Sequence, residues 1–130
     1  MRDRGVIWDL DGVLLDSHAS HFRAWRQVTG EFDIPFSEQT FNDTFGMNNH
    51  AVLQRWLGAR WTPEQEAAVV ERKESLYRGE ARHSATAMPG ARDWLARLQR
   101  AGWRQALGSS APRVNIDVVL EVLGFRVASA

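Results

Sequence analysis

The order of the expected strands and helices constrains this chain more than any other feature of its sequence. Residues 5–10 form a short apolar run that ends in a turn, which predicts a buried strand. The next strand is expected at 103–107, after about 90 mostly helical residues. A helix at 112–123 and the start of a third strand at 125–128 are expected to follow. Strands that alternate with helices predict an α/β fold with a parallel sheet.

Apolar periodicity, turn residues and helix caps divide the long middle stretch. Helices are expected at 17–30, 37–45, 48–57, from Thr62 to about 79, and at 91–101. Because a crossover connection needs far fewer residues, 17–88 is expected to be an inserted helical domain, with 1–16 and 89–130 as an α/β core. Two or three strands make a thin sheet, which indicates that this core is incomplete.

Composition and charge exclude several classes of protein. The chain has 130 residues with 16 basic and 16 acidic side chains, so no net field attracts it to nucleic acid or to an anionic membrane. It contains no cysteine, which excludes a disulfide scaffold, a thiolate metal site and a thiol nucleophile. No apolar run has the length of a membrane span. The sequence therefore favours a soluble, cytoplasmic protein without an obligate protein partner.

Two carboxylates stand at the end of the first expected strand. Asp9 and Asp11 are two positions apart, so in extended backbone both side chains face one site. Gly12 allows the sharp turn that follows. Carboxylates this close repel, so either a hard cation such as Mg²⁺ neutralises one, or one keeps its proton and suits general acid catalysis. An Asp-Gly turn with incidental acids is the plainer interpretation of these residues alone.

The longer string at 9–17, Asp-Leu-Asp-Gly-Val-Leu-Leu-Asp-Ser, changes that interpretation. It resembles the first motif of the haloacid dehalogenase superfamily, in the subgroup of small-molecule phosphatases and β-phosphoglucomutase-like enzymes. Weaker similarities follow in the expected order at 21–25, 45–49, 72–78, 88–90 and 106–110. The resemblance implies a Rossmann-like parallel sheet, of which two or three strands are present, with an inserted α-helical cap domain.

The resemblance assigns chemistry to both carboxylates. Asp9 is implied to be the nucleophile that attacks phosphorus and becomes an aspartyl-phosphate. Asp11 is implied to be the general acid for the leaving alcohol and then the base for water. The Asp9 carboxylate and the backbone carbonyl of Asp11 are implied to bind Mg²⁺, which offsets the charge of the phosphoryl group.

A second candidate site follows the second expected strand. Ser109 matches the family's second motif, a hydroxyl residue that binds the phosphoryl group. Gly108, Ser109 and Ser110 precede a helix, where hydroxyls and free N–H groups suit an anion. Ser110 is therefore a candidate phosphate ligand as well, although a serine at this place is often a simple helix cap.

Two further candidates lie in the expected helical domain. Lys73 lies at the centre of an apolar stripe, which fits either a lysine directed into a closed site or a surface lysine with a buried stem. It matches a family lysine that contacts substrate. His21 lies on the face that its helix is expected to bury, where a core histidine is the commoner explanation. The resemblance implies that this domain closes over the site and excludes water.

The sequence departs from the family in two ways. A lysine and an acidic pair are expected after the third strand, and the chain ends before either. Asn49 stands where mutases of the family carry an arginine for a second phosphate, which favours a phosphatase. The leading hypothesis is a Mg²⁺-dependent phosphatase acting on a small phosphorylated metabolite, with a sugar phosphate as one candidate. The alternatives are a sugar phosphomutase and an incomplete fragment that only binds phosphate.

Overall fold

The computed structural model describes residues 3–129, which form two compact units. One unit contains Met1–Ser17 and Ser84–Ala130, and the other contains His18–His83. Residues 84–88, which the sequence analysis placed in the helical domain, group with the first unit. The reason is that a short strand in this segment pairs with a strand of the first unit.

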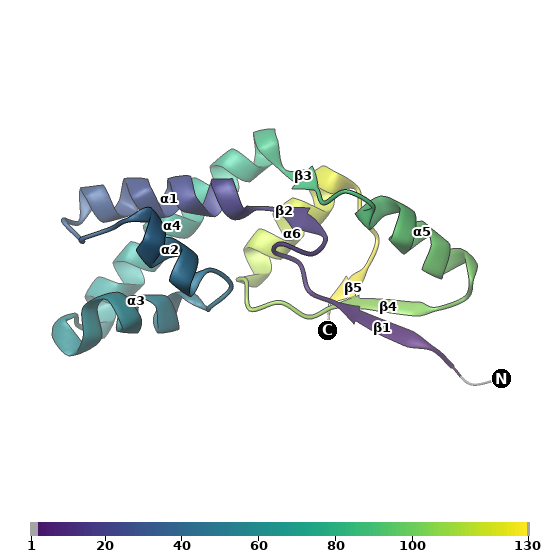
Figure 1. Ribbon diagram of the computed structural model, residues 1–130, viewed down its shortest axis with the longest axis horizontal. Helices are drawn as coiled ribbons and strands as arrows, with labels where there is room; N and C mark the ends of the chain where they lie inside the picture. The colour runs from purple at the N-terminus through teal and green to yellow at the C-terminus, as the bar shows by residue number, and fades with distance from the viewer. Residues whose placement is uncertain (1–2, 130) are drawn as a thin grey trace. The chain divides into compact units, whose positions relative to one another are not determined.

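The first unit is an α/β layer built on a parallel sheet (Figure 1). Its strands β1 (Gly5–Trp8), β4 (Arg104–Leu107) and β5 (Ala128–Ser129) lie in the order β1-β4-β5. Both pairings are parallel, as the alternation of strands and helices predicts. The helix α5 (Ala91–Arg100) precedes β4 in the chain, and α6 (Arg113–Leu123) connects β4 to β5.

Strand β1 ends earlier than the apolar run in the sequence. The run was expected to be extended to Leu10, but β1 stops at Trp8. The amide groups of three later residues, Val13, Leu14 and Leu15, all donate to the carbonyl oxygen of Leu10 at 3.2, 3.0 and 3.0 Å. Leu10 is 1% exposed, so its side chain stays in the core while its backbone begins a compact loop.

A second, two-stranded sheet joins distant parts of the first unit. The strands β2 (Leu15–Asp16) and β3 (Thr86–Ala87) pair in antiparallel orientation. The Met88 amide also donates to the Leu14 carbonyl at 2.9 Å. Residues on either side of the helical unit are therefore hydrogen-bonded neighbours. This pairing was not predicted from the sequence.

The second unit is helical throughout. It consists of α1 (His18–Glu31), α2 (Glu38–Thr44), α3 (Asn49–Leu57), the 3₁₀ turn η1 (Gly58–Arg60) and α4 (Pro63–Ser84), whose last residue lies beyond the unit. The expected capping box is present at the start of α4. The Gln65 amide donates to Thr62 Oγ1 at 3.2 Å, and the Thr62 amide donates to Gln65 Oε1 at 2.9 Å. Contrary to expectation, α4 continues past Gly79.

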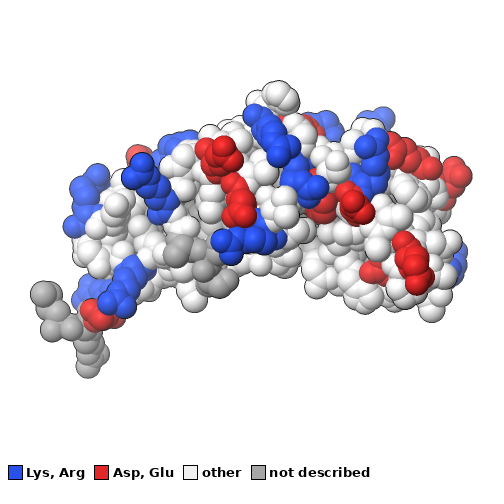
Figure 2. Space-filling model, turned by 180° about the vertical axis from the view of Figure 1, so that it is seen from behind, with Lys and Arg blue, Asp and Glu red and all other residues white. Residues whose placement is uncertain are grey.

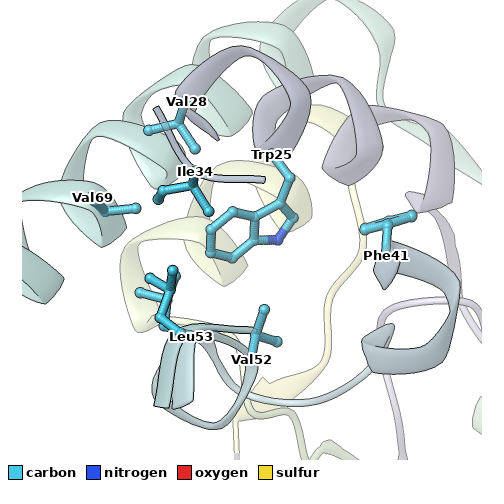
Figure 3. Close-up of a cluster of buried hydrophobic side chains, with 8 residues drawn as sticks. Trp25, Val28, Ile34, Phe41, Val52, Leu53 and Val69 are labelled. Atoms are coloured by element: carbon cyan, nitrogen blue, oxygen red, sulfur yellow. The ribbon is translucent and has the colours of Figure 1, made fainter. Parts of the chain in front are cut away.

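Trp25 lies in the core of the helical unit (Figure 3). Side chains from all four helices and the loops pack in this core, among them Val28, Ile34, Phe41, Val52, Leu53, Leu57 and Val69. Ala24 of α1 is buried as well, with 3% of its surface exposed. A small side chain there fits where a long one does not, so the buried arc of α1 is wider than its large apolar residues indicate.

Surface charges of both signs lie next to one another on the face shown in Figure 2. In the helical unit, the guanidinium group of Arg72 donates two hydrogen bonds of 3.0 Å to the Glu31 carboxylate. These bonds hold the pKa of Glu31 below its usual range and raise the pKa of Arg72. Among residues 3–129, no helix combines the length and apolarity that crossing a bilayer requires.

Candidate active site

Asp9 and Asp11 lie on the loop that directly follows β1. Asp9 is exposed, and its Oδ1 accepts a hydrogen bond of 2.7 Å from the Leu10 amide. The three bonds to the Leu10 carbonyl close the loop, and Gly12 adopts a φ of 77°, which favours glycine. The loop is therefore held by its own backbone bonds and presents an exposed carboxylate at the carboxyl end of a strand.

The second carboxylate is held by a side chain from further along the chain. Ser17 Oγ donates a 2.6 Å hydrogen bond to Asp11 Oδ1. Ser17 is 2% exposed, and Asp11 is half-buried. From the sequence, Ser17 was predicted only to begin a helix. Its place at the end of the 9–17 motif was the available signal, because β2 returns the chain toward the loop before α1 begins.

The loop with Ser109 leaves the neighbouring strand. Trp8 pairs with Leu107, and the Gly108 amide donates to the Trp8 carbonyl at 2.8 Å. A Cβ atom on Gly108 would lie 2.9 Å from Ile7 Cγ2, so the close approach of these strand ends requires glycine. Since parallel strands end at the same edge of a sheet, both loops leave from one edge.

Ser109 and Ser110 differ in their surroundings. Ser109 Oγ accepts a 3.1 Å hydrogen bond from the Ala111 amide and is half-buried. Ser110 is exposed and does not cap α6, because the N-cap residue is Pro112, which has no side-chain cap bond. The plainer expectation of a serine cap is therefore wrong. Both hydroxyls precede the N-terminus of α6, whose dipole favours an anion nearby.

Lys73 and His21 lie in the helical unit and contact each other. Lys73 Nζ donates to His21 Nδ1 at 3.0 Å and to Glu74 Oε1 at 2.7 Å. It also lies 5.2 Å from the ring centre of Trp25, within the range of a cation–π interaction. The Lys73 side chain is buried, so the explanation of a surface lysine with only a buried stem is wrong.

Aromatic stacking and an amide complete this group. The His21 ring stacks on Tyr77 with centroids 4.0 Å apart and planes 3° from parallel. Asn49 Nδ2 donates a 2.9 Å hydrogen bond to Glu74 Oε1. Glu74 was not among the candidate residues predicted from the sequence. Its adjacency to Lys73 was visible, but its bond to Asn49 spans 25 positions and has no local signal.

The donor set on the β1 loop suits a hard cation. Asp9 supplies an exposed carboxylate and Asp11 a backbone carbonyl, and both are oxygen donors. Mg²⁺ commonly takes one or two carboxylates and completes its shell with water and substrate phosphate. Within residues 3–129, no group of three or more His, Cys, Asp or Glu side chains is placed to hold a metal ion. Asp9 and Asp11 are the residues of this loop that could hold Mg²⁺ if water and a phosphate supplied its other ligands.

The fold and this acidic loop indicate one class of protein, and sequence comparison indicates the same class. A family model of haloacid dehalogenase-like hydrolases matches residues 4–129. The chain belongs to the haloacid dehalogenase-like hydrolase family. The expected fold class is confirmed as well, since a crystal structure of a hydrolase from Pseudomonas syringae matches with a TM-score of 0.88 at 24% identity, covering 98% of this chain and 61% of that one.

Two curated relatives are phosphatases. Hexitol phosphatase B of Escherichia coli strain K12 is 26% identical over 123 residues, covering 93% of this chain and 55% of that protein. Phosphoglycolate phosphatase of Cereibacter sphaeroides is 32% identical over 127 residues, covering 92% and 57%. The chain thus spans a little more than half the length of these relatives.

Proposed function

We propose that this protein hydrolyses the phosphate monoester of a small metabolite through an aspartyl-phosphate on Asp9. The observation that carries the proposal is the exposed Asp9 carboxylate at the end of β1, beside the strand whose loop bears Ser109. Family membership supports a phosphatase, because two of the matched relatives are named for that activity, although another is named a β-phosphoglucomutase.

The proposed reaction has two displacements. A carboxylate oxygen of Asp9 attacks phosphorus as the bond from phosphorus to the leaving oxygen breaks, and Asp11 gives its proton to that oxygen. A water molecule then attacks phosphorus while Asp11 takes its proton. The bond between phosphorus and the Asp9 oxygen breaks, which releases inorganic phosphate and restores both carboxyl groups.

Other residues hold the substrate. Ser109 and Ser110 donate hydroxyl hydrogen bonds to the phosphoryl oxygens at the N-terminal side of α6. Asp9 and the Asp11 carbonyl hold Mg²⁺, which when bound offsets the negative charge of the phosphoryl group. Lys73 and His21 contact the leaving group, for which a sugar phosphate is the candidate substrate.

Replacement of the nucleophile tests the proposal. Asp9→Asn keeps the size of the side chain but removes a competent nucleophile, so phosphate release with Mg²⁺ should fall by about a thousandfold or more. Release is measured with a panel of phosphate monoesters, and the melting temperature checks the fold. The matched control is Asp16→Asn, which changes an exposed carboxylate of β2 and should leave the rate unchanged.

Three other outcomes would contradict the proposal. Residual activity of Asp9→Asn above about a tenth of the parent would remove Asp9 from the role of nucleophile. Formation of a sugar phosphate isomer from an added bisphosphate, without net phosphate release, would identify a mutase. Binding of inorganic phosphate by folded protein, with no release from any ester in the panel, would identify a phosphate-binding fragment.

A further inference from the structure

A small pocket of the first unit lies outside the candidate active site. It has a volume of about 230 Å³ and is lined by α5, one residue of β4 and the connection from α6 to β5. Its apolar lining includes Leu95, Phe125 and Val127, and none of its lining residues belongs to a loop of the candidate active site. Pockets for drug-sized ligands commonly measure about 300–1,000 Å³. This pocket, which we call the α5 pocket, therefore suits a ligand of one or two rings.

The charged side chains that line the α5 pocket are both positive. They are Arg92 and Arg126, and no aspartate or glutamate among residues 3–129 lines the pocket. Within the part of the chain that the structure describes, neither guanidinium group forms an ion pair. Two cations beside one pocket repel each other, and an anion between them relieves that repulsion. The charge of the pocket therefore favours an anionic ligand.

Two contacts within the protein hold the guanidinium group of Arg92 in place. Its Nη1 atom donates a hydrogen bond of 2.7 Å to the carbonyl oxygen of Leu123, and its Cζ atom lies 4.9 Å from the ring centre of Phe125. A guanidinium has further N–H groups, which can donate two parallel hydrogen bonds to a planar carboxylate. Because the side chain is already ordered, binding an anion costs less conformational entropy.

The amide of Gln105 forms a neutral part of the pocket lining. Its Nε2 group donates to the Leu95 carbonyl at 2.9 Å, and its Oε1 atom accepts from the indole Nε1 of Trp8 at 2.9 Å. These bonds fix the side chain between β1 and α5, so this wall of the pocket is formed before a ligand arrives. Because both polar ends of the amide are engaged, discrimination by charge depends on the two arginines.

Volume, charge and apolar lining favour the same class of ligand. We propose that the α5 pocket binds a small aromatic carboxylate. The carboxylate accepts hydrogen bonds from Arg92 and Arg126, and the ring packs against Leu95 and Phe125. Arginine suits this ligand because its planar group matches a carboxylate and stacks on aromatic rings. The pocket is separate from the residues that would hydrolyse a phosphate ester, so this ligand is not the substrate of the proposed function.

Titration of the isotope-labelled 130-residue protein with 2-naphthoate tests the proposal by NMR spectroscopy. The backbone amide signals of Leu95, Ala96 and Phe125 should shift and then saturate. The neutral analogue 2-naphthamide has the same rings without the charge, so its affinity should be lower by about tenfold or more, the value of a hydrogen bond to a charged group. Binding is observed without turnover, so the test does not depend on phosphatase activity.

Substitutions at the pocket locate the binding. Arg126→Gln removes one charge from an exposed residue and should lower the affinity for 2-naphthoate by about tenfold. Arg100→Gln is the matched control, because Arg100 is an exposed arginine of α5 that does not line the pocket. Ala96→Leu adds volume to the pocket lining while both arginines remain, so it should abolish saturable binding. Melting temperatures check that the variants fold.

Contrary outcomes overturn this proposal and leave the proposed phosphatase function standing. Equal affinities for 2-naphthoate and 2-naphthamide, or for the parent and Arg126→Gln, would remove the role of charge. Undiminished binding by folded Ala96→Leu, or shifts confined to the loops of Asp9 and Ser109, would place the ligand elsewhere. Absence of saturable shifts at millimolar ligand would show that the pocket does not bind this class. A protein that binds 2-naphthoate but releases no phosphate would keep this site and lose the proposed function.

Discussion

A hydrogen bond from the buried Ser17 holds the side chain of Asp11, a proposed catalytic carboxyl group. The Ser17 hydroxyl donates to Asp11 Oδ1 from a position that is almost fully buried. A carboxyl group that must give and then take a proton needs a fixed orientation toward the leaving oxygen. We therefore expect Ser17 to influence the step that depends on Asp11.

Replacement of Ser17 should affect poor leaving groups most. Ser17→Ala removes the hydrogen bond that orients Asp11, so kcat for an alkyl phosphate should fall by about tenfold. The effect on an activated aryl phosphate should be smaller, because that leaving group needs little protonation. Ser17→Thr retains the hydroxyl and should recover much of the rate. Equal losses for alkyl and aryl esters in steady-state assays would show that Ser17 does not act through Asp11.

Single residues also show which candidate site residues can be predicted from their neighbours in the sequence. Asp9 and Asp11 became candidates through their spacing together with the longer string at 9–17, and the extended backbone assumed for them ends at Trp8. The apolar stripe around Lys73 left a buried lysine and a surface lysine with a buried stem as alternatives, and in the structure the side chain is buried. Glu74 and Ser17 could not be identified in this way, because their roles depend on bonds to Asn49 and Asp11 that form only when the chain has folded.

At the scale of helices and strands, residues with strong local preferences set the predictable boundaries. The capping box at Thr62 and the left-handed Gly124 after α6 correspond to the expected helix ends. Gly79 does not end α4, since a glycine inside a helix costs only about 1 kcal/mol and the buried Ala81 follows it. Strands β2 and β3 have two residues each, which is too short for any periodic signal.

The close approach of β1 and β4 leads to a prediction on stability. Gly108→Ala places a methyl group 2.9 Å from Ile7 Cγ2, so we expect a loss of about 1–2 kcal/mol in the free energy of unfolding. The double variant with Ile7→Ala removes that atom and should regain at least half of the loss. Denaturant unfolding measures both.

Gly30→Ala is the matched control for this prediction. Gly30 lies in α1 and a Cβ atom there has no neighbour within 4 Å, so alanine should be neutral or slightly stabilising. If Gly108→Ala proves as stable as the parent, the strand ends have more room than the structure indicates.

At the scale of the whole molecule, the sheet of the first unit has an open side. Among residues 3–129, β1 pairs only with β4 and stands at the edge of the sheet. Ile7 in the middle of β1 is 70% exposed. An edge strand with an apolar side chain is a template for pairing with another chain, and natural proteins often guard such edges with charge.

We therefore expect the 130-residue chain to self-associate through β1. Ile7→Lys should shift sedimentation velocity profiles toward the monomer, because a charged edge disfavours strand addition. Val122→Lys adds the same charge at an exposed apolar position of α6 and should have little effect. A monomeric parent with a sharp, reversible thermal transition would contradict this expectation.

The short pairing of β2 with β3 has an evolutionary consequence. The chain leaves the sheet-bearing unit at Ser17 and returns to it at Ser84. Because the strands next to these two points pair with each other, the first and last residues of the helical unit lie close together. A module with adjoining ends can be lengthened, shortened or replaced during descent without disturbing the scaffold that receives it. The helical unit can therefore vary in length and sequence while the loop that carries Asp9 is retained.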